Sequence, residues 1–156
     1  MPETPPVNAG FAAGEGHYLV GLDLAGRKVV VVGGGSVAQR RLPNLVSSGA
    51  QVHVIAIDPT PAVESFAGVH VHQRAYADGD LDGAWYAMAC TDDPAVNAAV
   101  VAEAERRHTF CVRADDARFG TAVTPASGRH RDVRFGVEGP ATVSYTHLRA
   151  HETVLD

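Results

Sequence analysis

Three glycines after an apolar run could bind phosphate groups, within the segment Val29–Ala38. Gly33 would permit a tight turn and Gly35 would let the backbone approach a pyrophosphate, while Ala38 is small enough for close packing of helix on strand. A helix that begins at Ser36 would direct free N–H groups and partial positive charge at the phosphates. The pattern predicts a dinucleotide-binding loop, and a purely structural tight turn is the alternative.

One carboxylate could select the cofactor. Asp58 lies 25 residues after Gly33, near the usual spacing of about 20 for the acidic residue that binds the ribose. It would accept hydrogen bonds from the ribose hydroxyls and repel a 2′-phosphate, so NAD is predicted rather than NADP. The alternative is that Asp58 only caps a helix near Thr60.

Two adjacent carboxylates, Asp115 and Asp116, follow an apolar run and could accept protons. Like charges this close can raise the pKa of one of the pair, and a carboxylate near a cofactor can assist dehydrogenation by taking up a proton. A solvated pair or a helix cap is the alternative.

No metal site is predicted from the histidines or cysteines. His70 and His72 share one strand face at a ligand-like i, i+2 spacing, but no third ligand is evident and a surface role is expected. Cys90 and Cys111 each lie in an apolar run, which predicts two buried free thiols. Free thiols fit a reducing, cytoplasmic setting.

The positive charge of the chain is concentrated in one stretch. The 156 residues carry a net charge of −5, which argues against a nucleic-acid partner. No apolar run approaches the roughly 20 residues that span a membrane, so no membrane partner is expected. Seven of the thirteen lysines and arginines lie between Arg106 and Arg134. This stretch suits an anionic small molecule, and a solvated face is the alternative.

Strand and helix signals alternate along the chain. The predicted strands are Lys28–Val32, Gln51–Ile57, Val69–Gln73, Ala84–Cys90, Thr109–Arg113 and Asp132–Val137. The predicted helices are Ser36–Ser48 with Ser36 as its N-cap, Thr60–Phe66, and Pro94–Arg107 with Asp93 as its N-cap. Residues Asp115–His130 are expected to be mostly loop, with a short extended piece near Thr121–Thr124. This alternation predicts an α/β fold with a Rossmann-like, doubly wound parallel sheet, in which ligands bind at the carboxyl ends of the strands. Thr91, after the fourth strand, is therefore a predicted cofactor contact.

Three segments together resemble a known family: Gly26–Arg40, Ala89–Asn97 and Arg106–Ala117. They are similar to the N-terminal domain of siroheme synthase, a precorrin-2 dehydrogenase that often also has sirohydrochlorin ferrochelatase activity. The likeness extends over roughly residues 18–137. Within this family, the sequence resembles most the forms that are fused to a uroporphyrinogen-III methyltransferase.

The resemblance implies a reaction and its residues. NAD⁺ would accept a hydride from precorrin-2 to give sirohydrochlorin, and Fe²⁺ insertion would follow in bifunctional members. The catalytic aspartate of the family corresponds to Asp115, and the NAD contacts correspond to Ser36, Val37, Ile57 and Asp58. The carboxylates of precorrin-2 would give the arginine-rich stretch a partner. Members of the family are expected to be homodimers.

The resemblance also suggests how the chain is divided. Residues 1–16 are expected to be a disordered lead-in, 17–124 the NAD-binding domain and 125–141 the start of a truncated dimerisation region. Residues 142–156 resemble vector-derived read-through and are expected to be non-native. Two other functions compete with the dehydrogenase: a non-catalytic NAD-binding module that senses redox state, and an NAD-dependent oxidoreductase for another substrate.

Overall fold

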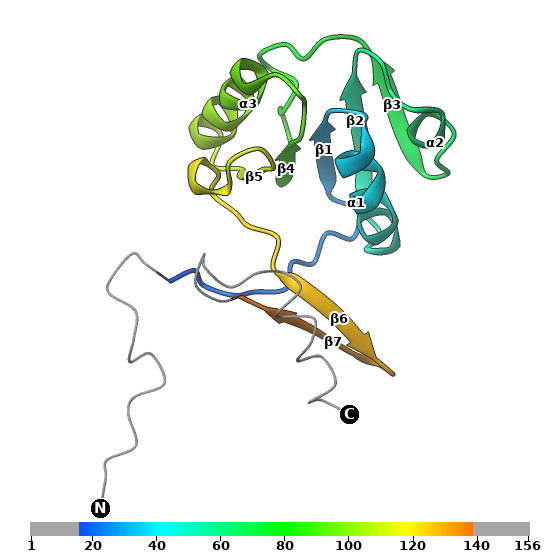
Figure 1. Ribbon diagram of the computed structural model, residues 1–156, viewed down its shortest axis with the longest axis vertical. Helices are drawn as coiled ribbons and strands as arrows, with labels where there is room; N and C mark the ends of the chain where they lie inside the picture. The colour runs from blue at the N-terminus through cyan, green and yellow to red at the C-terminus, as the bar shows by residue number, and fades with distance from the viewer. Residues whose placement is uncertain (1–15, 139–156) are drawn as a thin grey trace, which may run out of the picture.

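The computed structural model describes residues 16–138, in which strands and helices alternate (Figure 1). The strands are β1 (Lys28–Val32), β2 (Gln51–Ala56), β3 (Val69–Gln73), β4 (Tyr86–Ala89), β5 (Phe110–Arg113), β6 (Ala126–His130) and β7 (Val133–Val137). The helices are α1 (Ser36–Ser47), α2 (Pro61–Glu64), α3 (Pro94–Arg106) and the 3-10 turn η1 (Ala117–Phe119). The lead-in up to residue 15 and the predicted tail at 142–156 lie outside the described residues.

Five parallel strands form one sheet in the order β3-β2-β1-β4-β5. Helices α1 and α2 cover one face and α3 covers the other (Figure 1). The chain builds outward from β1 to β3 and then returns to β4, so the strand order reverses between β1 and β4. The predicted Rossmann-like, doubly wound sheet is confirmed, and its ligand crevice is expected at this reversal.

Four consecutive valines place β1 at the centre of the molecule. Val29 and Val31 join the core under α1, and Val30 and Val32 join the core under α3. A strand buried on both faces of a parallel sheet requires such a continuous apolar run. Val32 is in register with Ile55 of β2 and with Ala89 of β4. These strands therefore end together, at what we call the carboxyl edge of the sheet.

Several predicted boundaries differ from the structure by one or two residues. Gly35 is the N-cap of α1, so the prediction that Ser36 caps this helix is wrong. Strand β2 stops at Ala56 and leaves Ile57 outside the sheet. Helix α2 is one turn long, with Thr60 as its N-cap.

The segment from Asp115 to His130, predicted to be mostly loop, contains η1 and the strand β6, neither of which was predicted. Strand β6 pairs with β7 as an antiparallel hairpin. Its sequence, Ala-Ser-Gly-Arg-His, has one apolar residue and so lacks the alternation that reveals a strand. Gly128 lets the ring of Phe135 lie close over the β6 backbone, because a Cβ at this position would lie 2.5 Å from Cζ of Phe135.

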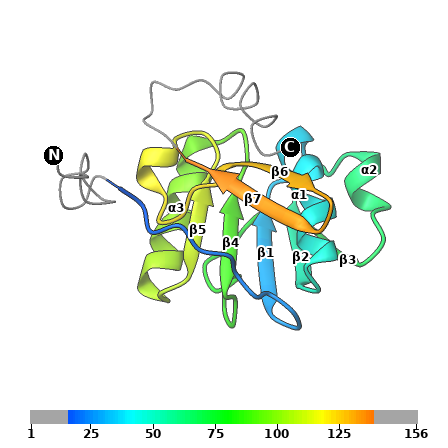
Figure 2. The ribbon, with the colours of Figure 1, turned by 90° about the horizontal axis from the view of Figure 1, so that it is seen from below.

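The β6–β7 hairpin lies outside the five-stranded sheet, on the side that carries α1 (Figures 1 and 2). It follows Ala122, which bridges to Val112 of β5 and packs against the core under α1. The assignment of residues 125–141 to a dimerisation region stays a prediction. Within residues 16–138, no helix combines the length and apolar character needed to cross a membrane.

Candidate functional site

The first two glycines of the loop after β1 are held tightly by neighbouring strands. Gly33 has φ +121, and its N–H donates to the carbonyl oxygen of Ile55 at 2.8 Å. A Cβ on Gly33 would lie 2.5 Å from the carbonyl oxygen of Cys90, and a Cβ on Gly34 would lie 2.7 Å from Cβ of Ala56. Side chains at these positions would therefore push the loop away from β2 and β4.

The third glycine faces open space. A Cβ on Gly35 would meet nothing within 4 Å, and no side chain caps the helix that follows. Among the described residues, the backbone N–H groups of Ser36 and Val37 have no hydrogen-bond partner in α1, as expected for a first helical turn. The first turn also carries no acidic side chain. An open backbone with free donors at a helix N-terminus fits the pyrophosphate of a dinucleotide.

The end of β2 presents an exposed carboxylate beside this loop. Asp58 and Ile57 are both exposed, with Ile57 at 71%. The alternative that Asp58 caps α2 is wrong, because the Thr60 hydroxyl accepts the hydrogen bond from Val63 N at 3.3 Å. Asp58 thus remains at the carboxyl edge for a ligand.

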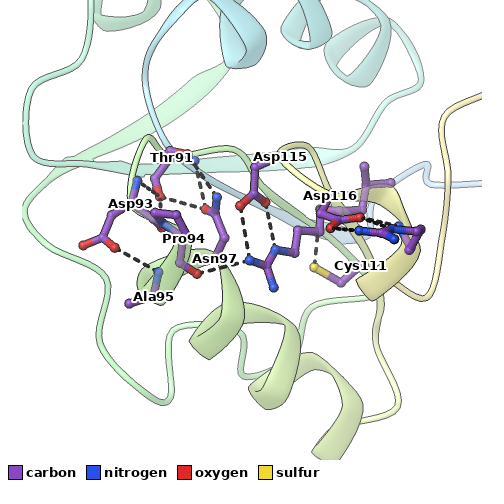
Figure 3. A network of polar contacts seen from close by, with 11 residues as sticks. Thr91, Asp93, Pro94, Ala95, Asn97, Cys111, Asp115 and Asp116 are labelled. Carbon is purple, nitrogen blue, oxygen red and sulfur yellow. Dashed lines mark hydrogen bonds and ion pairs between the residues drawn. The ribbon is translucent and has the colours of Figure 1, made fainter.

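The loop after β4 is fixed by a fully buried asparagine (Figure 3). Oδ1 of Asn97 accepts hydrogen bonds from Thr91 N at 3.0 Å and from Thr91 Oγ1 at 2.7 Å, and its Nδ2 donates to Thr91 O at 3.0 Å. Asp93 accepts from Ala95 N at 2.9 Å and caps α3, as predicted. The predicted cofactor contact Thr91 is therefore held in one position.

The end of β5 carries the predicted catalytic aspartate in an ion pair. Arg113 donates through Nε and Nη2 to the two carboxylate oxygens of Asp115, at 2.8 and 3.2 Å. This guanidinium, assisted by the amide of Asn97, lowers the pKa of Asp115 below its ordinary value. Asp116 pairs instead with Arg118, which lowers its pKa as well. The prediction that mutual repulsion raises one of these pKa values is therefore wrong.

The predicted site residues meet at one edge of the sheet. Asp58 follows β2, the glycine loop follows β1, Thr91 follows β4 and Asp115 follows β5, in the spatial order of the strands. The predictions missed Asn97 and Arg113. Arg113 had a local signal, since it ends β5 only two residues before Asp115, whereas Asn97 resembles any other polar helix residue.

The arginine-rich stretch divides into two groups. Arg106, Arg107, Arg113 and Arg118 pair with carboxylates of the same chain. The other three are exposed on the β6–β7 hairpin: Arg129, Arg131 and Arg134. Arg129 stands directly opposite Arg134 in the ladder, an arrangement that is unfavourable without an anion nearby. The hairpin is therefore the part of the stretch most suited to an anionic ligand.

The structure adds a third histidine to the pair on β3. His53 of β2 stacks on His70 with ring centroids 5.0 Å apart, and its Nδ1 lies 3.0 Å from Nε2 of His72. Burial and the neighbouring histidines lower the pKa of His53. In the described part of the chain, no group of three histidine, cysteine or acidic side chains is arranged to hold a metal ion. Cys90 and Cys111 are free thiols, as predicted, but only Cys111 is buried, and Cys90 is half-buried.

Comparison with known proteins agrees with this geometry. Residues 20–126 match the model of the family described as "Putative NAD(P)-binding". Siroheme synthase 1 of Serratia proteamaculans is 37% identical over 97 residues, which are 60% of this chain and 20% of that protein. Siroheme synthase 2 of Klebsiella pneumoniae subsp. pneumoniae is 35% identical over 113 residues, or 70% of this chain and 25% of that protein.

The fold is also similar to a solved structure described as SirC, precorrin-2 dehydrogenase. The TM-score is 0.75 at 25% identity, and the match covers 88% of this chain and 69% of that chain. By contrast, the chain spans about a quarter or less of the length of the siroheme synthases. The predicted resemblance to siroheme synthases and the predicted nicotinamide dinucleotide cofactor are confirmed. The chain belongs to the NAD(P)-binding family whose model it matches over residues 20–126.

Proposed function

We propose that this chain is an NAD⁺-dependent dehydrogenase that converts precorrin-2 to sirohydrochlorin in siroheme biosynthesis. The observation that carries the proposal is the row of Asp58, the glycine loop and Asp115 along the carboxyl edge. Strands β2 and β5 are three strand spacings apart, or roughly 14 Å at about 4.8 Å each. An extended dinucleotide that begins at Asp58 would therefore approach Asp115. The likeness to siroheme synthases and to a precorrin-2 dehydrogenase supports this substrate.

The cofactor would be held by backbone and by one carboxylate. Gly33 forms the turn, and the N–H groups of Gly35, Ser36 and Val37 would bind the pyrophosphate. Asp58 would accept hydrogen bonds from the ribose and exclude a 2′-phosphate, which favours NAD over NADP. Ile57 would lie beside the adenosine half, and Thr91 would border the nicotinamide half. When bound, the cofactor supplies the hydride acceptor.

Asp115 would accept the proton that dehydrogenation releases. Precorrin-2 loses two electrons and one proton as a hydride, forming NADH, and loses a second proton to the Asp115 carboxylate. Its Arg113 partner keeps this carboxylate ionised and ready to accept. The Asp115 side chain is 31% exposed, so the proton can pass on to solvent.

The central test follows NADH absorbance after the chain is mixed with NAD⁺ and precorrin-2. Asp115→Asn should lower the turnover by about 10²- to 10⁴-fold, the usual contribution of a general base, and leave the Kd for NAD⁺ unchanged. Asp116→Asn is the matched control and should retain turnover. NAD⁺ binding without any NADH formation by the unaltered chain would contradict the proposal and favour the redox-sensing module.

A second test concerns the anionic substrate. The Arg129→Gln/Arg131→Gln double variant should raise the KM for precorrin-2 without changing the Kd for NAD⁺. An unchanged KM would remove the hairpin from the substrate site. Iron insertion, a fused methyltransferase and a homodimer follow from the resemblance alone and stay predictions.

A further inference from the structure

Arg113 is a largely buried cation that faces the proposed proton acceptor. Only 14% of its side chain is exposed, and it binds both oxygens of Asp115 (Figure 3). A two-point contact between guanidinium and carboxylate fixes orientation as well as charge. The guanidinium is mostly covered by protein, whereas the Asp115 carboxylate stays 31% exposed, so the cation is fixed while its partner can still reach a ligand or solvent.

The same guanidinium has a second anchor on α3. Its Nη2 also donates to the carbonyl oxygen of Pro94, at 3.3 Å. Pro94 begins the turn that contains Asn97, and Asn97 holds Thr91 by three hydrogen bonds. Hydrogen bonds therefore anchor both the Thr91 loop and, through Arg113, the Asp115 carboxylate to the first turn of α3.

We infer that Arg113 is a positioning residue, which holds the Asp115 carboxylate ionised and in one orientation beside the Thr91 loop. The inference rests on the proposed function, in which Asp115 accepts the proton. The side chains that act on this carboxylate are Arg113 from β5 and the amide of Asn97 from α3. Asp116 pairs with Arg118, and Arg113 is the cation that binds Asp115.

The neighbouring pair supplies a matched control. Arg118 binds Asp116 with the same two-point geometry, at 3.0 and 2.9 Å. Arg118 is 82% exposed, however, and within residues 16–138 it has no second hydrogen-bonded anchor comparable to Pro94. Arg118→Met should therefore leave Asp115 unaffected.

The first measurement needs neither cofactor nor turnover. The Asp115 side-chain carboxyl carbon is titrated by NMR in the full chain, in Arg113→Met and in Arg118→Met. The midpoint should move to higher pH in Arg113→Met only. Arg113→Gln is measured in parallel, so that a folding failure of the methionine variant does not end the test. An unchanged midpoint in a folded Arg113 variant overturns the inference.

The second measurement is the pH profile of NADH formation. In Arg113→Met the acid-side loss of kcat should begin at a higher pH, and Arg113→Lys should restore part of the original profile. Misplacing a reacting group costs on the order of 10- to 100-fold, and a loss in kcat of this size is expected at neutral pH. The Kd for NAD⁺ should not change.

The two proposals fail differently. Full activity of Asp115→Asn would refute the role of Asp115 in the proposed function, whatever Arg113 does. An inactive Asp115→Asn together with an unaltered pH profile in Arg113→Met would overturn only the positioning role.

Discussion

Each end of α3 contains a buried polar side chain with its own network of hydrogen bonds. The two networks differ in whether their carboxylate is buried or partly exposed. Asn97 near the start of the helix is 0% exposed, and Glu103 near its end is 1% exposed. Burying such groups is costly unless their hydrogen bonds are satisfied. Both are satisfied, so burial alone does not distinguish a functional end from a structural one.

We call the network at Glu103 closed because its carboxylate is buried and saturated with donors; it reaches solvent through Arg107, which also pairs with the exposed Asp82. Its carboxylate accepts hydrogen bonds from Tyr76 Oη, Gly79 N, Leu81 N and Arg107 Nε. These donors lie on the connection from β3 to β4 and at the C-cap of α3. The interactions join the helix to that connection and leave no oxygen directed at solvent.

The network at Asn97 ends on a partly exposed group. Asn97 fixes Thr91, and the same helical turn anchors Arg113, whose partner Asp115 is 31% exposed. The interior of this network is as ordered as the one at Glu103, but its last carboxylate faces the carboxyl edge. A closed network stabilises the fold, whereas an open one positions a group for chemistry.

The largest expected effect is on stability at the closed end. Glu103→Ala should lower the free energy of unfolding by about 2–4 kcal/mol, because it leaves the Tyr76 hydroxyl and the buried Leu81 N–H without their acceptor. Urea denaturation measures this loss. The same variant, where folded, should keep its Kd for NAD⁺.

Glu105→Ala is the matched control, since Glu105 is an exposed glutamate on the same helix. Its effect should be within about 0.5 kcal/mol. A weakened Kd for NAD⁺ in folded Glu103→Ala would contradict the distinction between the two ends.

A substitution at the Asn97 end of α3, where the network is open, should cause a smaller loss of stability and a larger loss of function than one at Glu103. Asn97→Ala leaves the Thr91 N–H unpaired and should cost about 1–3 kcal/mol in unfolding free energy. It should also weaken NAD⁺ binding and slow NADH formation, because Thr91 loses its fixed position. Asn44→Ala, at an exposed position of α1, is the control. Unchanged binding and turnover in Asn97→Ala would make this end structural too.

The hydrogen bonds of Glu103 also predict that the free energy of unfolding depends on pH. Burial alone would raise the pKa of Glu103, but its hydrogen bonds from Tyr76 and Arg107 and from two backbone N–H groups lower it below 4.5 overall. The folded state therefore binds the proton less tightly than the unfolded state. Glu103 contributes stability above a pH of about 4.5, and this contribution is lost as pH falls through the folded pKa.

Urea denaturation of the original chain and of Glu103→Gln between about pH 7 and pH 3 measures this effect. The difference in unfolding free energy between them should shrink on the acid side. A difference that stays constant with pH would mean that the Glu103 charge adds nothing to stability.

The features that could be predicted from the sequence are those that depend on neighbouring residues in the chain. The valines of β1, the turn at Gly33 and the Asp93-Pro94 helix start are all read from a few adjacent residues. Asp58 and Asp115 could be placed at the carboxyl edge because each directly follows a predicted strand. These features account for the fold and for the positions of the candidate site residues.

What could not be predicted depends on side chains that meet across elements. The lowered pKa of Asp115 comes from Arg113 and Asn97, and the sequence does not show that the chain brings β5 and α3 together there. Adjacency to Asp116 suggested the opposite direction. Strand β6 was missed for the same reason, since its partner β7 and the ring of Phe135 over Gly128 define it.

The smallest effect, and the sharpest test of the comparison, is the coupling between the two ends. Asn97 and Glu103 are six residues apart on α3, or about 9 Å along the axis, and share no hydrogen-bond partner. Changes at such a distance usually add within about 0.5 kcal/mol. The Asn97→Ala/Glu103→Gln double variant should therefore lose the sum of the two single losses in urea denaturation. A coupling energy well above that limit would mean that α3 transmits strain between its ends, and that the closed network also supports the site.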